Sequence, residues 1–118
     1  MAAPLFFVFA GLFGAAGVAL AAVAAHGGGE AALAASASAM CLSHAPALLG
    51  LAIGIEKIRT ARLAGLLIIA GTLFFAGDLA MLRFAGIGLF PYAAPTGGWA
   101  MMLGWLAIAT GGLMRTKP

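Results

Sequence analysis

Four long apolar runs fill most of the chain, and the few charged residues lie almost entirely between or after them. The runs cover residues 4–25, 33–55, 63–82 and 96–114. The hydrocarbon core of a bilayer is about 30 Å thick and needs roughly 20 helical residues to cross it. Each run reaches or approaches that length. The pattern therefore predicts an all-α fold, a four-helix transmembrane bundle with short loops, in which residues 1–118 form a single domain.

The composition supports a membrane protein and argues against nucleic-acid binding. Hydrophobic residues make up 64% and charged residues 8% of the chain, whereas ordinary soluble domains have roughly 45–50% and 25%. The isoelectric point of about 9.8 rests on only six Lys and Arg against three Asp and Glu. Because these bases flank the apolar runs, they indicate topology and contacts with lipid headgroups of the bilayer.

The distribution of basic residues predicts the orientation. Four spans place both termini and the second loop on one side of the membrane. The bases on that side are Lys57, Arg59, Arg62, Arg115 and Lys117. The other side carries Arg83 alone, so the positive-inside rule predicts that both termini are cytoplasmic. We expect the first run to be a retained helix, because it lacks a preceding Lys or Arg and exceeds the roughly 7–15 apolar residues of a signal peptide.

The two outer loops are predicted at residues 26–32 and 83–95. The second is longer and mostly apolar, so we expect it to lie along the membrane surface. Its aromatic residues, with one from the following helix, are Phe84, Phe90, Tyr92 and Trp99. Such side chains suit the headgroup zone, where an apolar ring and a polar group are both satisfied.

Rows of small residues predict how the helices associate, because lipid tails are as apolar as leucine and close packing must supply the attraction. The last run carries Gly97, Ala100, Gly104, Ala107 and Gly111 at alternating three- and four-residue steps, as in a left-handed coiled coil. The other glycines expected at helix contacts are Gly11, Gly14, Gly17, Gly50 and Gly54. The rows can pack within one chain. The first helix has more than one small face, so contact with another molecule is the alternative.

Pro46 lies inside the second run. It cannot donate to the carbonyl of Leu42, and its ring disturbs that turn. We therefore expect a kink. Neighbouring helices tolerate such breaks in membrane proteins, so a purely structural kink is sufficient.

Asp78 is an acid within the third run, about four residues or roughly 6 Å from its outer end. An intramembrane acid must be protonated, paired or hydrated, and it is a functional candidate by default. Arg83 is its predicted structural partner, and Ser36 and Ser38 lie at matching depth. Both a functional role and an ion pair or polar clamp remain open at this stage.

His44 is predicted near the middle of the bilayer, at a depth matched by Thr72 and Trp105. The indole N–H of a tryptophan far from the interface needs a partner. We therefore expect these three residues to form a buried polar cluster. The expected role of His44 is to satisfy neighbouring polar groups, with proton transfer as the alternative.

The sequence argues against a metal, a cofactor and catalysis. His26 and His44 differ in depth by roughly 16 Å, so they cannot bind one haem iron. Met40, Cys41 and His44 could meet around a soft metal, but Cys41 is the only cysteine. No nucleophilic triad, metalloprotease motif or phosphate-binding loop is present, so we predict neither a cofactor nor an enzyme.

Several segments in order resemble one small membrane family. These are G-A-A-G-V-A-L-A-A-V-A-A-H-G from Gly14, S-H-A from Ser43, G-T-L-F-F-A-G-D-L from Gly71 and P-T-G-G-x5-G-W from Pro95. They resemble the domain of unknown function 423, which includes bacterial YgdD-like and eukaryotic transmembrane-protein-256-like proteins. The chain departs from the family pattern at Met40-Cys41, where Tyr-Gln is expected, and at Gly77-Asp78-Leu79-Ala80, where G-S-L-Y is expected. The resemblance implies a four-helix inner-membrane protein and supplies no reaction.

Two functions follow as hypotheses. The first is a non-catalytic accessory or structural subunit that packs against other membrane proteins, or against itself, through small-residue helix faces. The alternative is a small proton-coupled carrier that uses Asp78 and His44. Against the carrier, small multidrug carriers use an acid in the first helix, and the first run here has none.

Overall fold

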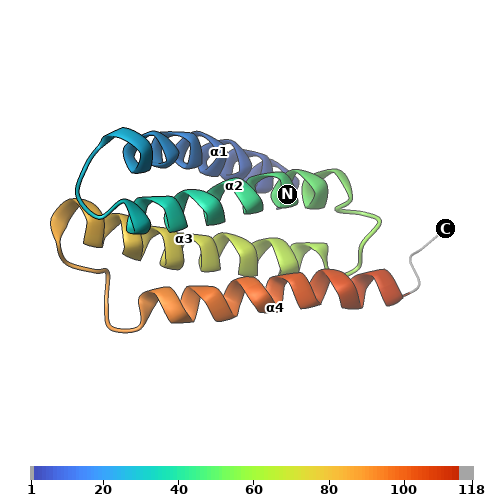
Figure 1. Cartoon of the computed structure of the whole chain (residues 1–118). Helices are drawn as coiled ribbons and strands as arrows, with labels where there is room; N and C mark the ends of the chain where they lie inside the picture. Colours follow the sequence, from blue (N-terminus) through green and yellow to red (C-terminus); the bar gives the residue numbers. More distant parts are fainter. Residues whose placement is uncertain (1, 115–118) are drawn as a thin grey trace.

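The computed structural model describes residues 2–114 and contains four helices in the predicted order. These are α1 (Ala2–His26), α2 (Ala31–Ile53), α3 (Ala61–Ala85) and α4 (Ala93–Leu113). The helices alternate in direction, and the α2–α3 loop lies at the same end as the start of α1 and the end of α4 (Figure 1). The described part of the chain is therefore an all-α bundle, as predicted.

The outer loop between α3 and α4 is shorter than predicted, although it remains the longer of the two outer loops. α3 continues to Ala85, and α4 begins at Ala93. Gly86 ends α3 in the left-handed conformation, with φ at 76°, which glycine adopts without a steric penalty. Pro95 belongs to the first turn of α4, where a missing backbone N–H costs no helical hydrogen bond.

Three of the described helices, α1, α2 and α3, are long and apolar enough to cross a membrane. α4 has 21 residues and lies alongside α3 (Figure 1), but it does not meet the same criterion of apolarity. Its glycines and threonines lower its hydropathy. A fourth membrane crossing by α4 therefore stays a prediction.

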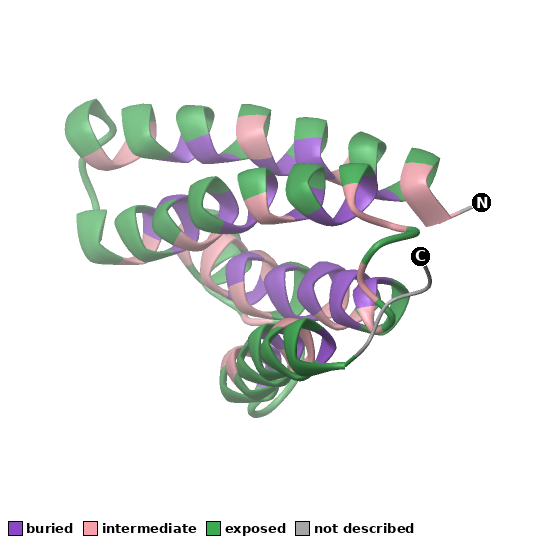
Figure 2. Ribbon diagram, turned by 90° about the vertical axis from the view of Figure 1, so that its right-hand side faces the viewer, coloured by how far each residue is buried: buried purple, intermediate pink, exposed green. Residues whose placement is uncertain are grey.

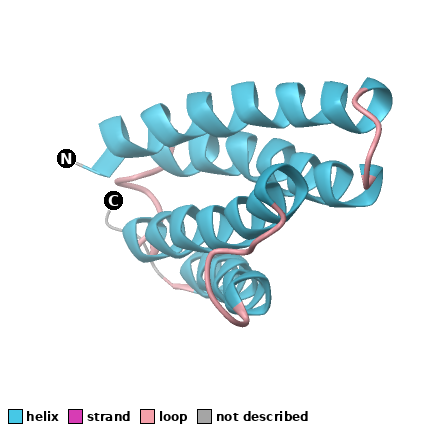
Figure 3. Cartoon of the chain, turned by 90° about the vertical axis from the view of Figure 1, so that its left-hand side faces the viewer, coloured by secondary structure: helices cyan, strands magenta, loops and turns pink. Residues whose placement is uncertain are grey.

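The helices form an open row in chain order, in which α1 packs on α2, α2 on α3 and α3 on α4. The backbones of α1 and α4 do not meet anywhere in residues 2–114. Figure 2 shows the buried residues on the facing sides of neighbouring helices, and Figure 3 shows the loops that join the ends of successive helices. The outer helices α1 and α4 therefore leave much of their surface uncovered.

The contact between α3 and α4 follows the predicted glycine seam. Gly97, Gly104 and Gly111 are all buried. A Cβ on Gly97 would lie 2.5 Å from the carbonyl oxygen of Gly71, and a Cβ on Gly104 would lie 2.8 Å from Cγ1 of Ile68. The two backbones thus approach more closely than any larger side chain would allow.

The other glycines expected at contacts have different surroundings. Gly17 is buried, and a Cβ there would lie 2.6 Å from Cγ of Leu42. Gly14 has only an ordinary contact with α2, and Gly54 is the residue that ends α2. Gly11 and Gly50 are exposed, and a Cβ added at either would have no neighbouring atom within 4 Å. These two glycines do not contribute to packing within one chain.

α2 continues through Pro46 without ending there. Pro46 is itself exposed. A change in the direction of the helix axis at this residue stays a prediction.

Candidate functional site

His44 on α2 and Trp105 on α4 link these two helices through their side chains. The indole Nε1 of Trp105 donates to Nε2 of His44 at 3.0 Å, and Nδ1 of His44 lies 2.7 Å from the carbonyl oxygen of Met40. The His44 side chain is buried, with 4% of its surface exposed. An indole N–H can only donate. His44 Nε2 must therefore accept, and the ring proton lies on Nδ1, where it is donated to Met40.

This arrangement leaves no free nitrogen on the His44 ring. A proton carrier or metal ligand needs at least one nitrogen that can exchange its partner. No group of three or more His, Cys, Asp or Glu that could hold a metal occurs among residues 2–114. Both nitrogens of His44 are thus used in contacts within the bundle, one to Trp105 on α4 and one to Met40 on its own helix.

Thr72 does not hydrogen-bond to the other two members of the predicted cluster. Its side chain is fully buried, and its Oγ1 has no hydrogen-bond partner in the described structure. The predicted buried cluster of three residues is therefore wrong. His44 and Trp105 pair, but 45% of Trp105 is exposed, and the Thr72 hydroxyl is not part of the contact.

Asp78 holds the loop between α3 and α4. Its Oδ1 accepts a hydrogen bond of 2.8 Å from the backbone N–H of Leu89, and 8% of the residue is exposed. A Cβ on Gly88 would collide with this carboxyl group, so a larger residue there would displace the Asp78 side chain from its present position. Because α3 extends to Ala85, Asp78 lies about 10 Å from the helix end rather than about 6 Å. The loop folds back to reach it.

The predicted ion pair between Asp78 and Arg83 is absent. The pair of Arg62 and Glu56 is the only salt bridge found in residues 2–114. Arg83 instead donates from Nη2 to the carbonyl oxygens of Gly27 and Gly28, at 3.2 and 2.7 Å. A charged guanidinium group binds exposed carbonyls at a helix end strongly, and the α1–α2 loop offers two of them.

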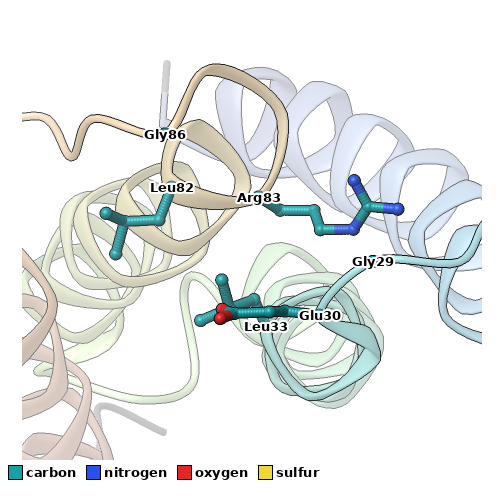
Figure 4. Close-up of a pocket in the computed structure, with 6 residues that line it drawn as sticks. All are labelled: Gly29, Glu30, Leu33, Leu82, Arg83 and Gly86. Atoms are coloured by element: carbon teal, nitrogen blue, oxygen red, sulfur yellow. The ribbon is translucent and has the colours of Figure 1, made fainter.

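Arg83 therefore fastens the α1–α2 loop to the last turn of α3. Figure 4 shows its side chain extending toward Gly29, while Glu30 points away from the guanidinium group. A Cβ on Gly29 would lie 3.1 Å from Cζ of Arg83, and the φ of Gly29 is 64°. His26, the last residue of α1, is exposed and makes no side-chain hydrogen bond within the described residues.

Ser38 makes a polar contact that the sequence indicates only by depth. Its hydroxyl donates to the carbonyl oxygen of Gly17 at 2.7 Å and so links α2 to α1. The sequence carries part of the signal, because a small residue such as Gly17 lets a facing helix approach closely enough for a serine hydroxyl to reach its backbone. The pairing with one particular glycine required the structure.

A cavity of about 180 Å³ lies between α1, α2 and α3. We call it the α1–α3 cavity. Its lining includes Phe13 and Ala16 from α1, Cys41 from α2, and Thr72 and Ala76 from α3. Thr72 and Cys41 are its only polar side chains. The cavity is therefore mostly apolar and has no charged residue in its lining, unlike the loop contacts made by Asp78 and Arg83.

The family relationship agrees with the one indicated by the sequence segments. The family model described as "Protein of unknown function (DUF423)" matches residues 20–98, which is most of the chain. The protein thus belongs to a class of small helical membrane-type proteins, and the particular family is DUF423. No curated protein and no solved structure gives a significant match to the chain.

Proposed function

We propose that the chain is a non-catalytic integral membrane protein that acts as an accessory or structural subunit, with α1 binding a helix of another membrane protein. The observation that carries this proposal is that several polar side chains bond within the chain, whereas one face of α1 has no partner among the described residues. The side-chain hydrogen bonds that the structure shows for four of them join helices or loops of the same chain: these are His44, Trp105, Ser38 and Arg83. The outer face of α1 meanwhile remains uncovered.

The geometry of α1 supports this binding face. The buried seam of α1 consists of Phe6, Ala10, Phe13, Gly17 and Leu20. At about 100° per residue, Ala15 lies on the opposite side of the helix, with Gly11 and Ala19 one turn before and after it. All three are exposed. A row of small residues lets a second helix approach closely in lipid, where close packing drives association.

We further propose that the chain resides in a bacterial inner membrane with both termini in the cytoplasm. The described bases Lys57, Arg59 and Arg62 lie at one end of the bundle, and Arg83 lies at the other. Arg115 and Lys117 lie outside the described residues. Reporter fusions after the C-terminus and within the α3–α4 loop test this orientation, because the two fusions must report opposite compartments.

The alternative function, a small proton-coupled carrier, rests on Asp78 alone once His44 is hydrogen-bonded at both nitrogens. Asp78 borders an open pocket of about 460 Å³ that the α3–α4 loop forms, and no cation neutralises it within the described residues. A carrier acid binds its proton and substrate in turn. Under this alternative, Asp78→Asn folds normally and abolishes proton-coupled uptake into vesicles.

The experiment that tests the subunit proposal is extraction from native membranes in mild detergent, followed by native electrophoresis and mass spectrometry. We expect a stoichiometric membrane partner that Ala15→Leu displaces. The control is Ala109→Leu, which adds the same volume to an exposed position on α4. The proposal is wrong if the chain migrates alone, or if both variants retain the partner equally.

A further inference from the structure

The α1–α3 cavity is open to the surrounding membrane and differs from an ordinary packing defect. Ala16 on α1 and Leu73 on α3, which line it, are both exposed residues. Its volume of about 180 Å³ compares with the engineered apolar cavity of about 150 Å³ in another protein that binds benzene. One six-membered ring therefore fits, and that ring can reach the cavity from the bilayer.

Thr72 lines the cavity, and its buried hydroxyl has no hydrogen-bond partner among the described residues. The exposed hydroxyls of Thr110 and Ser43 donate to the carbonyl oxygen four residues earlier, at Leu106 and Ala39. The fully buried hydroxyl of Thr72 makes no such bond among the described residues. An unpaired buried hydroxyl costs about 1–3 kcal/mol. Threonine populates two χ1 rotamers in a helix, so this hydroxyl can turn toward a bound molecule.

The depth of Thr72 restricts what the molecule can be. Thr72 lies about 16 Å from Ala61 and about 20 Å from Ala85 along α3. Phospholipid ester carbonyls sit outside a hydrocarbon core that is about 30 Å thick, so they do not reach the middle of the helix. An acyl chain reaches it but carries no acceptor. The occupant must bring its own oxygen to mid-membrane depth.

We infer that the α1–α3 cavity binds a lipophilic ring that carries a carbonyl oxygen, with the Thr72 hydroxyl donating to that oxygen. Phe13 supplies an aromatic wall, and Ala16 and Ala76 leave the space for the ring. The cavity extends along α3 from Thr72 to Ala80 and shares no lining residue with the loop pocket at Asp78. The inference is independent of the partner proposed for α1.

The test is methyl NMR of the full chain in lipid nanodiscs, with two probes of the same shape. Acetophenone carries a carbonyl, whereas α-methylstyrene has a methylene group in its place. We expect acetophenone to shift the methyl signals of Ala16 and Ala76 saturably, with an affinity about five- to tenfold higher than that of α-methylstyrene. That ratio corresponds to one hydrogen bond of about 1 kcal/mol.

Three variants make the result specific. Thr72→Val replaces the hydroxyl with a methyl group and should abolish the difference between the probes, whereas Thr110→Val should keep it. Ala16→Leu fills the cavity from its exposed side and should abolish binding of both, which keeps the inference testable if Thr72→Val does not fold. Equal affinities for the two probes in the unmodified chain mean binding of an adventitious additive only and overturn the inference. The absence of saturable shifts also overturns the inference, because it is the result expected if the cavity is a groove filled by lipid acyl chains.

Discussion

Trp105 on α4 donates its indole N–H to Nε2 of His44 on α2, although the backbones of these two helices are not neighbours in the row. The rings also pack at a centroid distance of 5.7 Å with an interplanar angle of 58°. One side chain thus ties together helices that α3 would otherwise keep independent. The pair therefore stabilises the position of the second half of the chain relative to the first half.

Removing the indole donor should weaken the fold without removing the aromatic ring. We expect Trp105→Phe to lower the free energy of unfolding by about 1 kcal/mol, because it leaves His44 Nε2 unpaired. Trp99→Phe is the matched control, since Trp99 is 65% exposed and donates no hydrogen bond in the described structure. Equilibrium unfolding in mixed micelles measures both. Equal losses in the two variants would contradict the role of this bond.

Substitutions at Asp78 should separate its hydrogen bond from its charge. Asp78→Asn keeps the Oδ1 acceptor for Leu89 N–H, so we expect a stable loop, whereas Asp78→Leu should speed exchange of the Leu89 amide about tenfold or more. Hydrogen exchange of the loop measures this effect. Since Asp78 makes no ion pair with Arg83, Arg83→Gln should not rescue either variant, and the two free-energy changes should add. A rescue would restore the ion-pair interpretation.

Loss of the Arg83 side chain should release the loop between α1 and α2. Arg83→Gln removes the charge-assisted bonds to Gly27 and Gly28, and we expect faster amide exchange across residues 27–30 and a loss of about 1–2 kcal/mol. Arg83→Lys should restore only part of this stability, since a compact ammonium group differs from a guanidinium group in reach and geometry. Limited proteolysis from the outer side gives a second measure. Full rescue by lysine would show that charge alone matters.

Adjacent glycines on α4 offer a matched test of helix packing. Gly97→Ala should destabilise the fold by about 1–3 kcal/mol, because the added Cβ would meet the Gly71 carbonyl. Gly98→Ala meets nothing within 4 Å and should be neutral or stabilise by at most about 1 kcal/mol. Thermal unfolding in one detergent compares them directly. If both variants lose the same stability, the close approach of α3 and α4 is not what limits substitution.

The helices themselves are predictable because a span of about 20 apolar residues leaves few alternatives in lipid. The residues at which the helices begin and end are less predictable. The apolar pattern puts Pro95 in a loop and Arg83 beyond the helix end, because a proline usually interrupts a helix. The structure begins α4 at Ala93 and tolerates Pro95 in the first turn. The spacing of Gly97, Gly104 and Gly111 indicates a contact face correctly, but it does not identify α3 as the partner.

Some polar contacts could also be predicted from the sequence, and others could not. Depth alone brings His44 and Trp105 to one level, and their chemistry is complementary, so their pairing could be expected. Arg83 could not be assigned to Gly27 and Gly28, because its partners are backbone carbonyls whose direction depends on loop conformation. The same holds for Asp78, whose partner is the amide of Leu89 in a loop that folds back on α3.

The order of the helices in the row also bears on how the chain assembles. Because each helix packs on the one before it, nearly all contacts between helices join neighbours along the chain. Such topologies fold rapidly and can form as each segment arrives. The bond between His44 and Trp105 spans 61 residues, so it can form only after all four helices have been synthesised. It therefore belongs to the late contacts of assembly, and it joins the two halves of the chain only once both are in place.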